Sequence, residues 1–104
     1  MLQGVSSGDN VYGDDGNDKV SGGDGNDHLY GGIGEDCLTG GIGNDVIEGD
    51  VDNDSIYGGS GSDFLTGEIG NDVLDGGGDC NDIITGCIGD DVIAGGFGMD
   101  IPSG

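Results

Sequence analysis

Residues 22–48 read GGDGNDHLY, GGIGEDCLT and GGIGNDVIE, three copies of a nine-residue unit with no spacer between them. Numbering the positions of a unit as slots, each copy has glycine in slots one, two and four, aspartate in slot six and an aliphatic residue in slot eight. A short fixed period is the signature of a repeat architecture. This stretch therefore decides how the rest of the chain is interpreted.

The unit extends outward over almost the whole chain. Taking the glycine that opens each copy as slot one gives eleven units over residues 4–103, with one inserted residue at Gly76. No linker interrupts the array, so we predict a single repeat domain over residues 1–104. Slot six is aspartate in every unit, at Asp9, Asp18, Asp27, Asp36, Asp45, Asp54, Asp63, Asp72, Asp82, Asp91 and Asp100.

The composition is unusual for a layered globular domain. The 104 residues include 28 glycines and carry a formal net charge of −21. Low hydrophobicity with high net charge is typical of disorder, and a strongly acidic chain can also be a solvating tail. Strict periodicity argues against both, since a disordered tail has no reason to repeat aspartate at a fixed spacing. The charge also argues against nucleic acid as a direct partner, because phosphates are bound by basic residues.

No stretch approaches the roughly 18 apolar residues of a membrane-spanning helix, so we expect no transmembrane segment. The N-terminus MLQGVSSGDN lacks the basic start and apolar run of a secretory signal peptide. The three cysteines, Cys37, Cys80 and Cys87, are too few for a disulfide framework and lack zinc-ligand spacing. We expect them to be reduced, partly buried thiols.

The unit predicts an all-β parallel roll. Its first five residues are rich in glycine and are expected to form a turn, whereas slots seven to nine, such as residues 46–48, form a three-residue strand. Two units then make one coil of about eighteen residues, and alternate units form two parallel sheets that face each other across the slot-eight side chains. At about 4.8 Å per coil, about five and a half coils give a rod roughly 26 Å long.

These turns require cations. Stacking of the coils brings together slot-six carboxylates two units apart, such as Asp27 and Asp45, and unneutralised carboxylates this close repel strongly. The available donors are carboxylate and backbone carbonyl oxygens rather than imidazoles or thiolates. Hard oxygen donors in a flexible cage suit Ca²⁺ better than Mg²⁺, which keeps a tight octahedron and its water. We therefore predict calcium.

The repeats resemble the G-G-x-G-x-D-x-U-x nonapeptides of the RTX (repeats-in-toxin, haemolysin-type) calcium-binding proteins, over about 100 of the 104 residues. The resemblance implies a right-handed parallel β-roll (β-solenoid) that folds only with calcium between its turns, and it implies secretion to an extracellular location. It also implies side-chain ligands from the slot-six aspartates. Carbonyl ligands are implied from turn glycines around slots two and four, namely Gly23, Gly25, Gly32, Gly34, Gly41, Gly43, Gly59 and Gly61.

Counting the gaps between stacked turns gives up to about nine calcium ions. About nine ions would bring about +18 against the formal −21, leaving about −3. Such a site exists only in the folded chain, so we expect calcium binding and folding to be coupled.

Two aligned apolar rows are expected on the surface. Slot seven gives Val46, Phe64, Ile83 and Ile101 on one sheet, and slot three gives Ile33, Val51, Ile69 and Ile88, which we assign to the other sheet. An aligned apolar patch often marks a contact surface. We therefore weigh a partner or self-association surface at the Val46/Phe64/Ile83/Ile101 row against ordinary strand propensity. His28 shares slot seven and is expected to be solvated.

The favoured function is a calcium-binding structural module of an extracellular protein. It is not expected to be an enzyme, because no acid is paired with a base in a pocket. The alternative is a filament or adhesive subunit that stacks end to end through calcium and open coil edges, since the array has almost no capping residues. An ice-binding solenoid would need a full threonine ladder, which Thr39, Thr66 and Thr85 do not form.

Overall fold

The computed structural model describes residues 2–3, 8–78, 80–95 and 101–103, with side chains for residues 8–78 and 80–95. The strands are β1 (Leu2–Gln3), β2 (Asn10–Tyr12), β3 (Lys19–Asp24), β4 (His28–Ile33), β5 (Cys37–Ile42), β6 (Val46–Val51), β7 (Ser55–Ser60), β8 (Phe64–Ile69), β9 (Val73–Asp75), β10 (Ile83–Ile88), β11 (Val92–Ala94) and β12 (Ile101–Ser103). Within these described ranges, no helix is long and apolar enough to cross a membrane.

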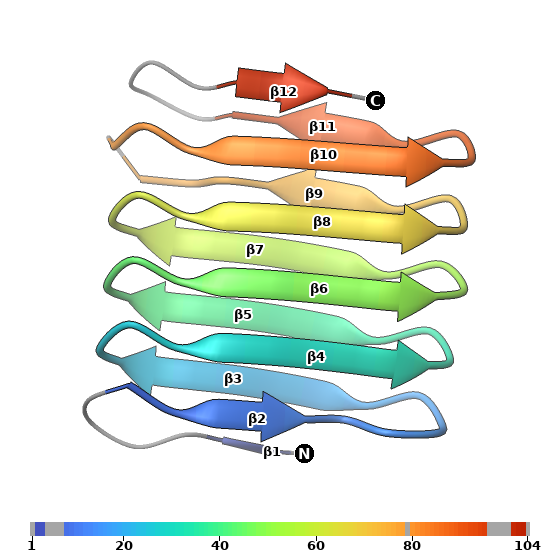
Figure 1. Cartoon of the computed structure of the whole chain (residues 1–104), viewed down its shortest axis with the longest axis horizontal. Helices are drawn as coiled ribbons and strands as arrows, with labels where there is room; N and C mark the ends of the chain where they lie inside the picture. The colour runs from blue at the N-terminus through green and yellow to red at the C-terminus, as the bar shows by residue number, and fades with distance from the viewer. Residues whose placement is uncertain (1, 4–7, 79, 96–100, 104) are drawn as a thin grey trace.

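The chain winds into two parallel sheets that face each other, with the even-numbered strands in front in Figure 1. The odd-numbered strands form a six-stranded sheet in the order β1-β3-β5-β7-β9-β11, and the even-numbered strands form the other in the order β12-β10-β8-β6-β4-β2. The molecule is a slab with extents of 29 × 29 × 13 Å. The predicted parallel β-roll, with alternate units in opposite sheets, is confirmed.

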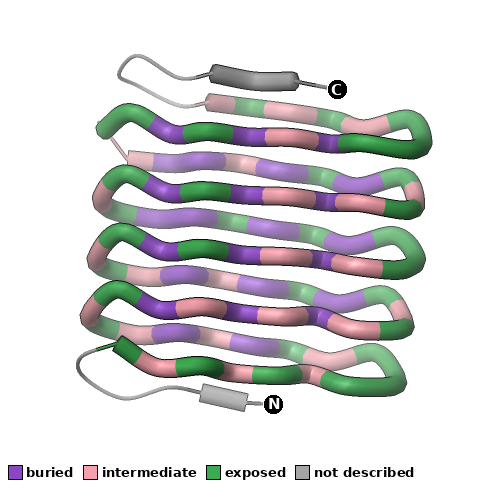
Figure 2. Tube along the Cα trace, in the orientation of Figure 1, coloured by how far each residue is buried: buried purple, intermediate pink, exposed green. Residues whose placement is uncertain are grey.

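A single layer of aliphatic side chains fills the space between the sheets. The buried members are Val20, Leu29, Leu38, Ile47, Ile56, Leu65, Leu74 and Ile84, and Val11 and Ile93 pack against them. All of them occupy slot eight, so the predicted core is confirmed, and Figure 2 shows buried positions recurring along each inner strand. Burial of one such side chain contributes about 1.5–3 kcal/mol. The slab is too thin to hold a second core layer that could compensate for the loss of one of these side chains.

The strands are longer than the sequence predicts. Most of them, from β3 to β8 and again β10, have six residues, which are slots seven to nine of one unit and slots one to three of the next. The prediction that slots one to three belong to the turn was wrong. Pairing with the neighbouring coils satisfies their backbone groups and overrides the poor strand propensity of glycine. The turn is confined to slots four to six.

A left-handed residue in slot two interrupts the alternation of side chains along each long strand. Gly32 has a φ of 95°, and Asp50 and Glu68 have φ values of 74° and 73° at the equivalent position. Slots two and three are consequently both outside the core, as in β6, where only Ile47 and Gly49 are buried. A non-glycine residue held in this region costs about 1–3 kcal/mol.

The two exposed apolar rows lie on the same sheet, so their assignment to opposite sheets was wrong. Slot three continues the strand begun by the preceding unit, and it therefore places Val51 and Ile69 in β6 and β8. These strands also carry Val46 and Phe64. The predicted strands ended at slot nine, and slot three was therefore assigned to the wrong sheet. The side chain of Ile101 lies outside the described residues.

Candidate metal centre

The candidate side-chain ligands lie in the turns at the two ends of the strands. Slot-six aspartates of successive coils form an aspartate ladder at each edge, in which the backbone N–H of each aspartate donates to Oδ1 of the aspartate one coil further on. The distances are 2.8–2.9 Å, from Asp9 to Asp82 along one edge and from Asp18 to Asp91 along the other. The predicted juxtaposition of Asp27 and Asp45 belongs to the first of these, with 2.8 Å between Asp27 N and Asp45 Oδ1.

In eight of the slot-six aspartates, the second carboxylate oxygen is buried without a hydrogen-bond partner. This holds for Oδ2 of Asp18, Asp27, Asp36, Asp45, Asp54, Asp63, Asp72 and Asp91. Oδ2 lies against the glycine that opens the same unit, since a Cβ at Gly22 would lie 2.6 Å from Oδ2 of Asp27. This contact explains why slot one is glycine. A buried acceptor left without a donor costs about 1–3 kcal/mol, and more when it is charged.

Burial makes the ionised form of these carboxylates unfavourable. It is the main cause that raises the pKa of Asp27, Asp36, Asp45 and Asp72 above 3.8, and that raises the pKa of Asp54 and Asp63 to about 7. The backbone N–H that each Oδ1 accepts lowers the pKa, and neighbouring aspartates raise it further. The turns thus hold buried carboxylates whose ionised form a nearby cation would stabilise.

The glycines predicted as carbonyl ligands all have a positive φ, but those of slot two lie in strands rather than in the turn, namely Gly23, Gly32, Gly41 and Gly59. Their φ values lie between 93° and 127° at Gly23, Gly25, Gly32, Gly34, Gly41, Gly43, Gly59 and Gly61. A Cβ at Gly43 would overlap the carbonyl oxygen of Gly25 one coil earlier, and a Cβ at Gly34 would overlap that of Gly16. Only hydrogen fits between these stacked turns. They combine carboxylate oxygens with backbone carbonyls, an all-oxygen donor set that fits Ca²⁺.

A second set of hydrogen bonds, found at both edges and not predicted from the sequence, joins the turns through slot five. Oδ1 of an asparagine accepts the backbone N–H of the slot-five residue one coil further on, at 2.8–2.9 Å, for Asn17, Asn26, Asn44, Asn53 and Asn71. It runs opposite to the aspartate ladder, because the aspartates accept from the preceding coil. The recurrence of asparagine in slot five was the available signal.

The inserted residue lies after Gly76 rather than at it. Gly76 is buried, and a Cβ there would overlap Oδ2 of Asp82, which is the contact of a glycine that opens a unit. The chain absorbs the extra residue at residues 77–78, where φ is 75° and 44°. The aspartate ladder continues across the insertion, with 2.8 Å between Asp63 N and Asp82 Oδ1.

The predicted aspartates differ between the middle and the ends of the array. The middle ones are 1–3% exposed, namely Asp27, Asp36, Asp45, Asp54, Asp63, Asp72 and Asp82. Asp9, Asp18 and Asp91 are only partly buried, because fewer coils cover them. Asp100 lies outside the described residues. The middle of the array therefore holds the most enclosed candidate sites.

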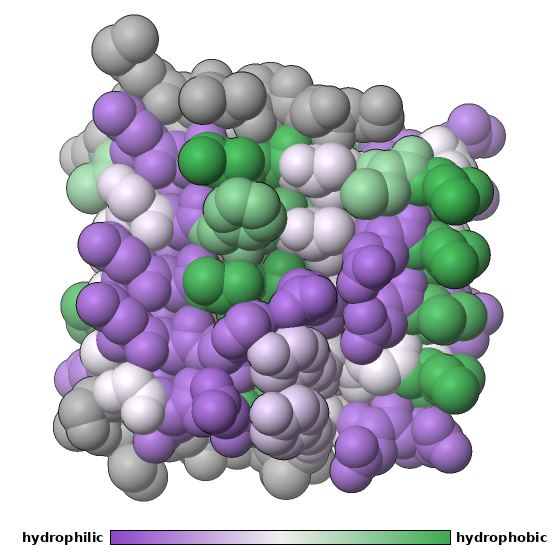
Figure 3. Space-filling model, in the orientation of Figure 1, coloured by the Kyte–Doolittle hydropathy of each residue, from purple (hydrophilic) through white to green (hydrophobic). Residues whose placement is uncertain are grey.

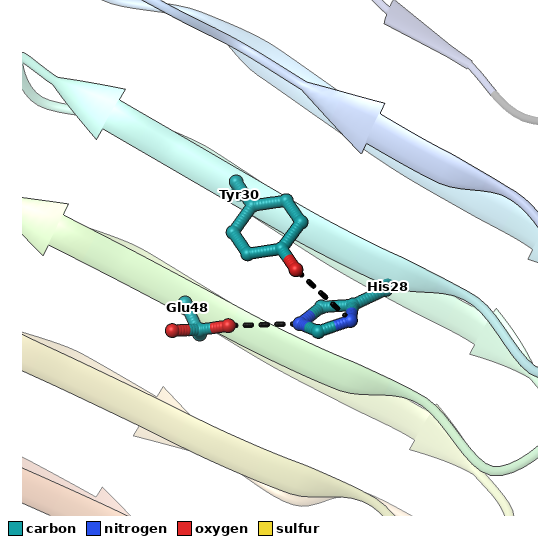
Figure 4. A network of polar contacts seen from close by, with 3 residues as sticks. All are labelled: His28, Tyr30 and Glu48. Atoms are coloured by element: carbon teal, nitrogen blue, oxygen red, sulfur yellow. Dashed lines mark hydrogen bonds and ion pairs between the residues drawn. The ribbon is translucent and has the colours of Figure 1, made fainter.

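His28 is held in a network on the outer face rather than being simply solvated (Figure 4). Its Nε2 lies 2.8 Å from Oε2 of Glu48, and its Nδ1 lies 3.1 Å from the hydroxyl of Tyr30. The imidazole also stacks on the Tyr30 ring, which in turn stacks on Tyr12 with centroids 4.7 Å apart. Both ring nitrogens are engaged within the protein. The network links β2, β4 and β6.

The cysteines are free, as expected, but they are exposed rather than partly buried. Cys37 is in slot seven and Cys87 in slot two, and both slots lie outside the core. Cys80 lies in the turn that precedes β10.

Taken together, the strands and turns define a β-solenoid whose stacked turns bring together carboxylate and carbonyl oxygens of neighbouring coils. A family model described as the RTX calcium-binding nonapeptide repeat matches four times, at residues 3–38, 12–47, 48–79 and 77–101. The chain belongs to this family, whose repeats bind calcium. Comparison with curated proteins and with solved structures gave no match.

Proposed function

We propose that this chain is a calcium-binding structural module of an extracellular protein, which folds as calcium binds between its turns and has no catalysis of its own. The observation that carries the proposal is the series of buried Oδ2 atoms without a hydrogen-bond partner. Burying a carboxylate without a counter-charge is strongly unfavourable. A divalent cation between the coils removes that penalty, and it is therefore expected to drive the coils together.

Each proposed site takes side-chain oxygens from slot six and carbonyl oxygens from slots two and four. The slot-six contribution comes from the aspartates of the ladder, and Asp100 is assigned by its place in the repeat. Ca²⁺ takes six to eight oxygen ligands in flexible geometry, which two adjacent turns can supply jointly. Counted as gaps between stacked turns, up to about nine ions bind.

An extracellular location fits this mechanism. Extracellular calcium modules typically bind with dissociation constants of about 10⁻⁴–10⁻³ M. The formal charge of −21 opposes compaction until it is neutralised. Calcium concentration would then decide whether the chain is folded.

Far-UV circular dichroism and calorimetry on the whole chain test the proposal. We expect a disordered spectrum in chelator, a β spectrum on adding CaCl₂, and no such transition with the same concentration of MgCl₂. Calorimetry in parallel gives the number of ions bound. A β spectrum that persists unchanged after chelation would contradict coupled folding.

End-to-end assembly stays a prediction. The strands β11 and β12 at one end of the slab, and β1 and β2 at the other, each pair with one neighbour within their sheets. Such strands can accept a further coil. Calcium-dependent growth of light scattering, with fibres in electron microscopy, would support a filament. A monodisperse calcium-loaded chain would exclude one.

A further inference from the structure

The even-numbered sheet has an apolar outer face that the calcium-binding turns do not use. Two rows of side chains cross its strands, and we call them the paired rows. One consists of Val46, Phe64 and Ile83, the other of Ile33, Val51, Ile69 and Ile88. These side chains are 36–68% exposed, and the strand register places them beside one another. Figure 3 shows them as two hydrophobic columns on the viewed face.

The odd-numbered sheet carries no comparable row among its described residues. Its exposed large apolar residues are Ile42, Tyr57, Val73 and Val92. Ile42 pairs with Asp24 on one side and Ser60 on the other, whereas Val73 and Val92 form one isolated pair. Strand propensity alone would favour apolar rows on both sheets. The asymmetry instead favours a contact surface on the even-numbered one.

An acidic cluster separates the paired rows on β6 and β8. Carboxylate oxygens of Glu48, Asp50 and Glu68 lie within 4.8 Å of one another. A side-chain hydrogen bond with Asp50, together with burial and nearby negative charge, raises the pKa of Glu68 to about 7. The basic groups of the chain offer little compensation, since His28 contacts Glu48 alone of these three and Lys19 lies in β3 of the opposite sheet.

The negative charge of the acidic cluster determines which partners this face can bind. The strands β6 and β8 are the central pair of their six-stranded sheet, so a face-to-face pair of copies that buried both rows would bring the two acidic clusters together. Carboxylates brought into contact in this way repel one another strongly. Nucleic acid and anionic lipid surfaces are repelled for the same reason. Apolar rows on either side of carboxylates complement a partner with basic side chains flanked by apolar ones.

We propose that this face docks a basic amphipathic helix, which lies across β4–β10 with basic side chains on Glu48, Asp50 and Glu68 and apolar side chains on the paired rows. The rows are five residues apart along each strand, which is about 16 Å at 3.3 Å per residue. A helix with its side chains is about 10–12 Å wide, so it fits between the rows, with its flanking side chains against those of the rows. Spanning four strands takes about 10–13 helical residues.

A synthetic helix of about 14 residues tests the proposal, with a stripe of lysines bordered on both sides by leucines and glutamines opposite. Its fluorescein-labelled form is titrated with the whole chain in saturating calcium, and anisotropy reports binding. The titration is carried out at about 0.15 M salt, because charges more than about 8 Å apart are then largely screened. We expect this peptide to bind, a version with glutamate for lysine not to bind, and a scrambled version to bind at least about fivefold more weakly.

Matched variants locate the contact. Glu48→Gln/Asp50→Asn/Glu68→Gln keeps the side-chain shapes and is expected to weaken binding at least about tenfold. The control Asp24→Asn/Glu35→Gln/Asp90→Asn removes the same charge from exposed side chains outside the cluster and should change affinity less than about twofold. Phe64→Ser/Ile69→Ser tests the rows against Ile42→Ser/Val73→Ser on the odd-numbered sheet. Circular dichroism in calcium confirms that each variant is folded.

Four results would overturn the proposal. The first is no binding of the lysine peptide. The second is equal weakening by both triple variants, which would indicate attraction to net charge alone. The third is a calcium ion lost only in the cluster variant while peptide affinity is unchanged, which would make the cluster a cation site. The fourth is a calcium-loaded dimer that Phe64→Ser/Ile69→Ser dissociates and the peptide does not.

Discussion

The two oxygens of a slot-six carboxylate have different roles. In Asp45, Oδ1 accepts the backbone N–H of Asp27, whereas Oδ2 is buried without a hydrogen-bond partner. The first oxygen aligns one coil on the next, and the second is the one available to a metal ion. Because one side chain has both features, alignment of the turns and the proposed binding of calcium are linked at each slot-six aspartate.

Asp45→Asn separates the two roles. The amide keeps an oxygen for the Asp27 N–H but loses the charge and the second acceptor, so we expect calcium to bind the affected sites about tenfold more weakly, about 1.4 kcal/mol. Calcium titration by calorimetry and circular dichroism measures the change. Asp24→Asn, an exposed carboxylate in the unit of residues 22–30, is the control. The same calcium midpoint for both variants would contradict a ligand role for Asp45.

Slot-four glycines allow a second separation, between backbone conformation and the space left by the neighbouring coil. Gly16 and Gly43 have φ values of 105° and 127°, but a Cβ at Gly16 would meet nothing within 4 Å. Gly16→Ala should therefore cost only the left-handed conformation, about 1–2 kcal/mol. Gly43→Ala should cost at least about 2 kcal/mol more, because its Cβ would overlap the carbonyl oxygen of Gly25. Urea unfolding in saturating calcium measures both. Equal losses would show that stacking imposes no further constraint.

At the scale of the strand, inward packing depends on slot eight. The neighbouring slots seven and nine face outward, and slot one is a glycine, so each six-residue strand contributes one large side chain to the core. Sheet pairing then repeats the same contact coil after coil. Stability should consequently be concentrated in this one layer of side chains.

Two adjacent residues of β6 test this concentration. Ile47→Ala removes a fully buried side chain and is expected to lower the free energy of unfolding by about 2–5 kcal/mol. Val46→Ala, on the outer face, should lower it by less than about 1 kcal/mol. Urea midpoints in saturating calcium give the comparison. Similar losses would mean that the core is not confined to slot eight.

At the scale of the whole molecule, the behaviour is governed by charge held in a thin slab. Each turn buries aspartates, and the coils stack them along both edges. Burial is the main cause that raises the pKa of Asp54 and Asp63 to about 7 in the metal-free fold. Protons and, under the proposed function, calcium would therefore neutralise the same groups by different means.

Acid should partly replace calcium as the driver of folding. The folded pKa values of Asp54 and Asp63 lie above the unfolded value of about 3.9, so the metal-free fold binds more protons between about pH 7 and pH 4, and its stability rises as the pH falls through that window. Calcium affinity should fall over the same window, because ligands must be deprotonated. Circular dichroism in chelator and calcium midpoints at pH 7.5 and about pH 5 measure both trends. Asp54→Asn/Asp63→Asn should reduce the pH dependence, and an unchanged dependence would contradict the assignment.

The repeat by itself determined the period, the parallel two-sheet roll and the slot-eight core that includes Leu29 and Ile47. It also indicated the stacking of Asp27 with Asp45, because each of these follows from side chains recurring at one spacing. The tertiary structure alone decided where each strand ends. Slots one to three become strand only because a coil about eighteen residues away supplies their hydrogen bonds, and local propensity carries no information about that partner.

Two consequences of this pairing cannot be predicted from a single unit. Extension of the strands moved Val51 and Ile69 onto the sheet of Val46 and Phe64, and it brought Glu48 and Asp50 of one coil against Glu68 of the next. The calcium-binding turns follow from what every unit has in common. The outer face depends on how the units differ, and pairing of neighbouring strands determines which of those differences meet.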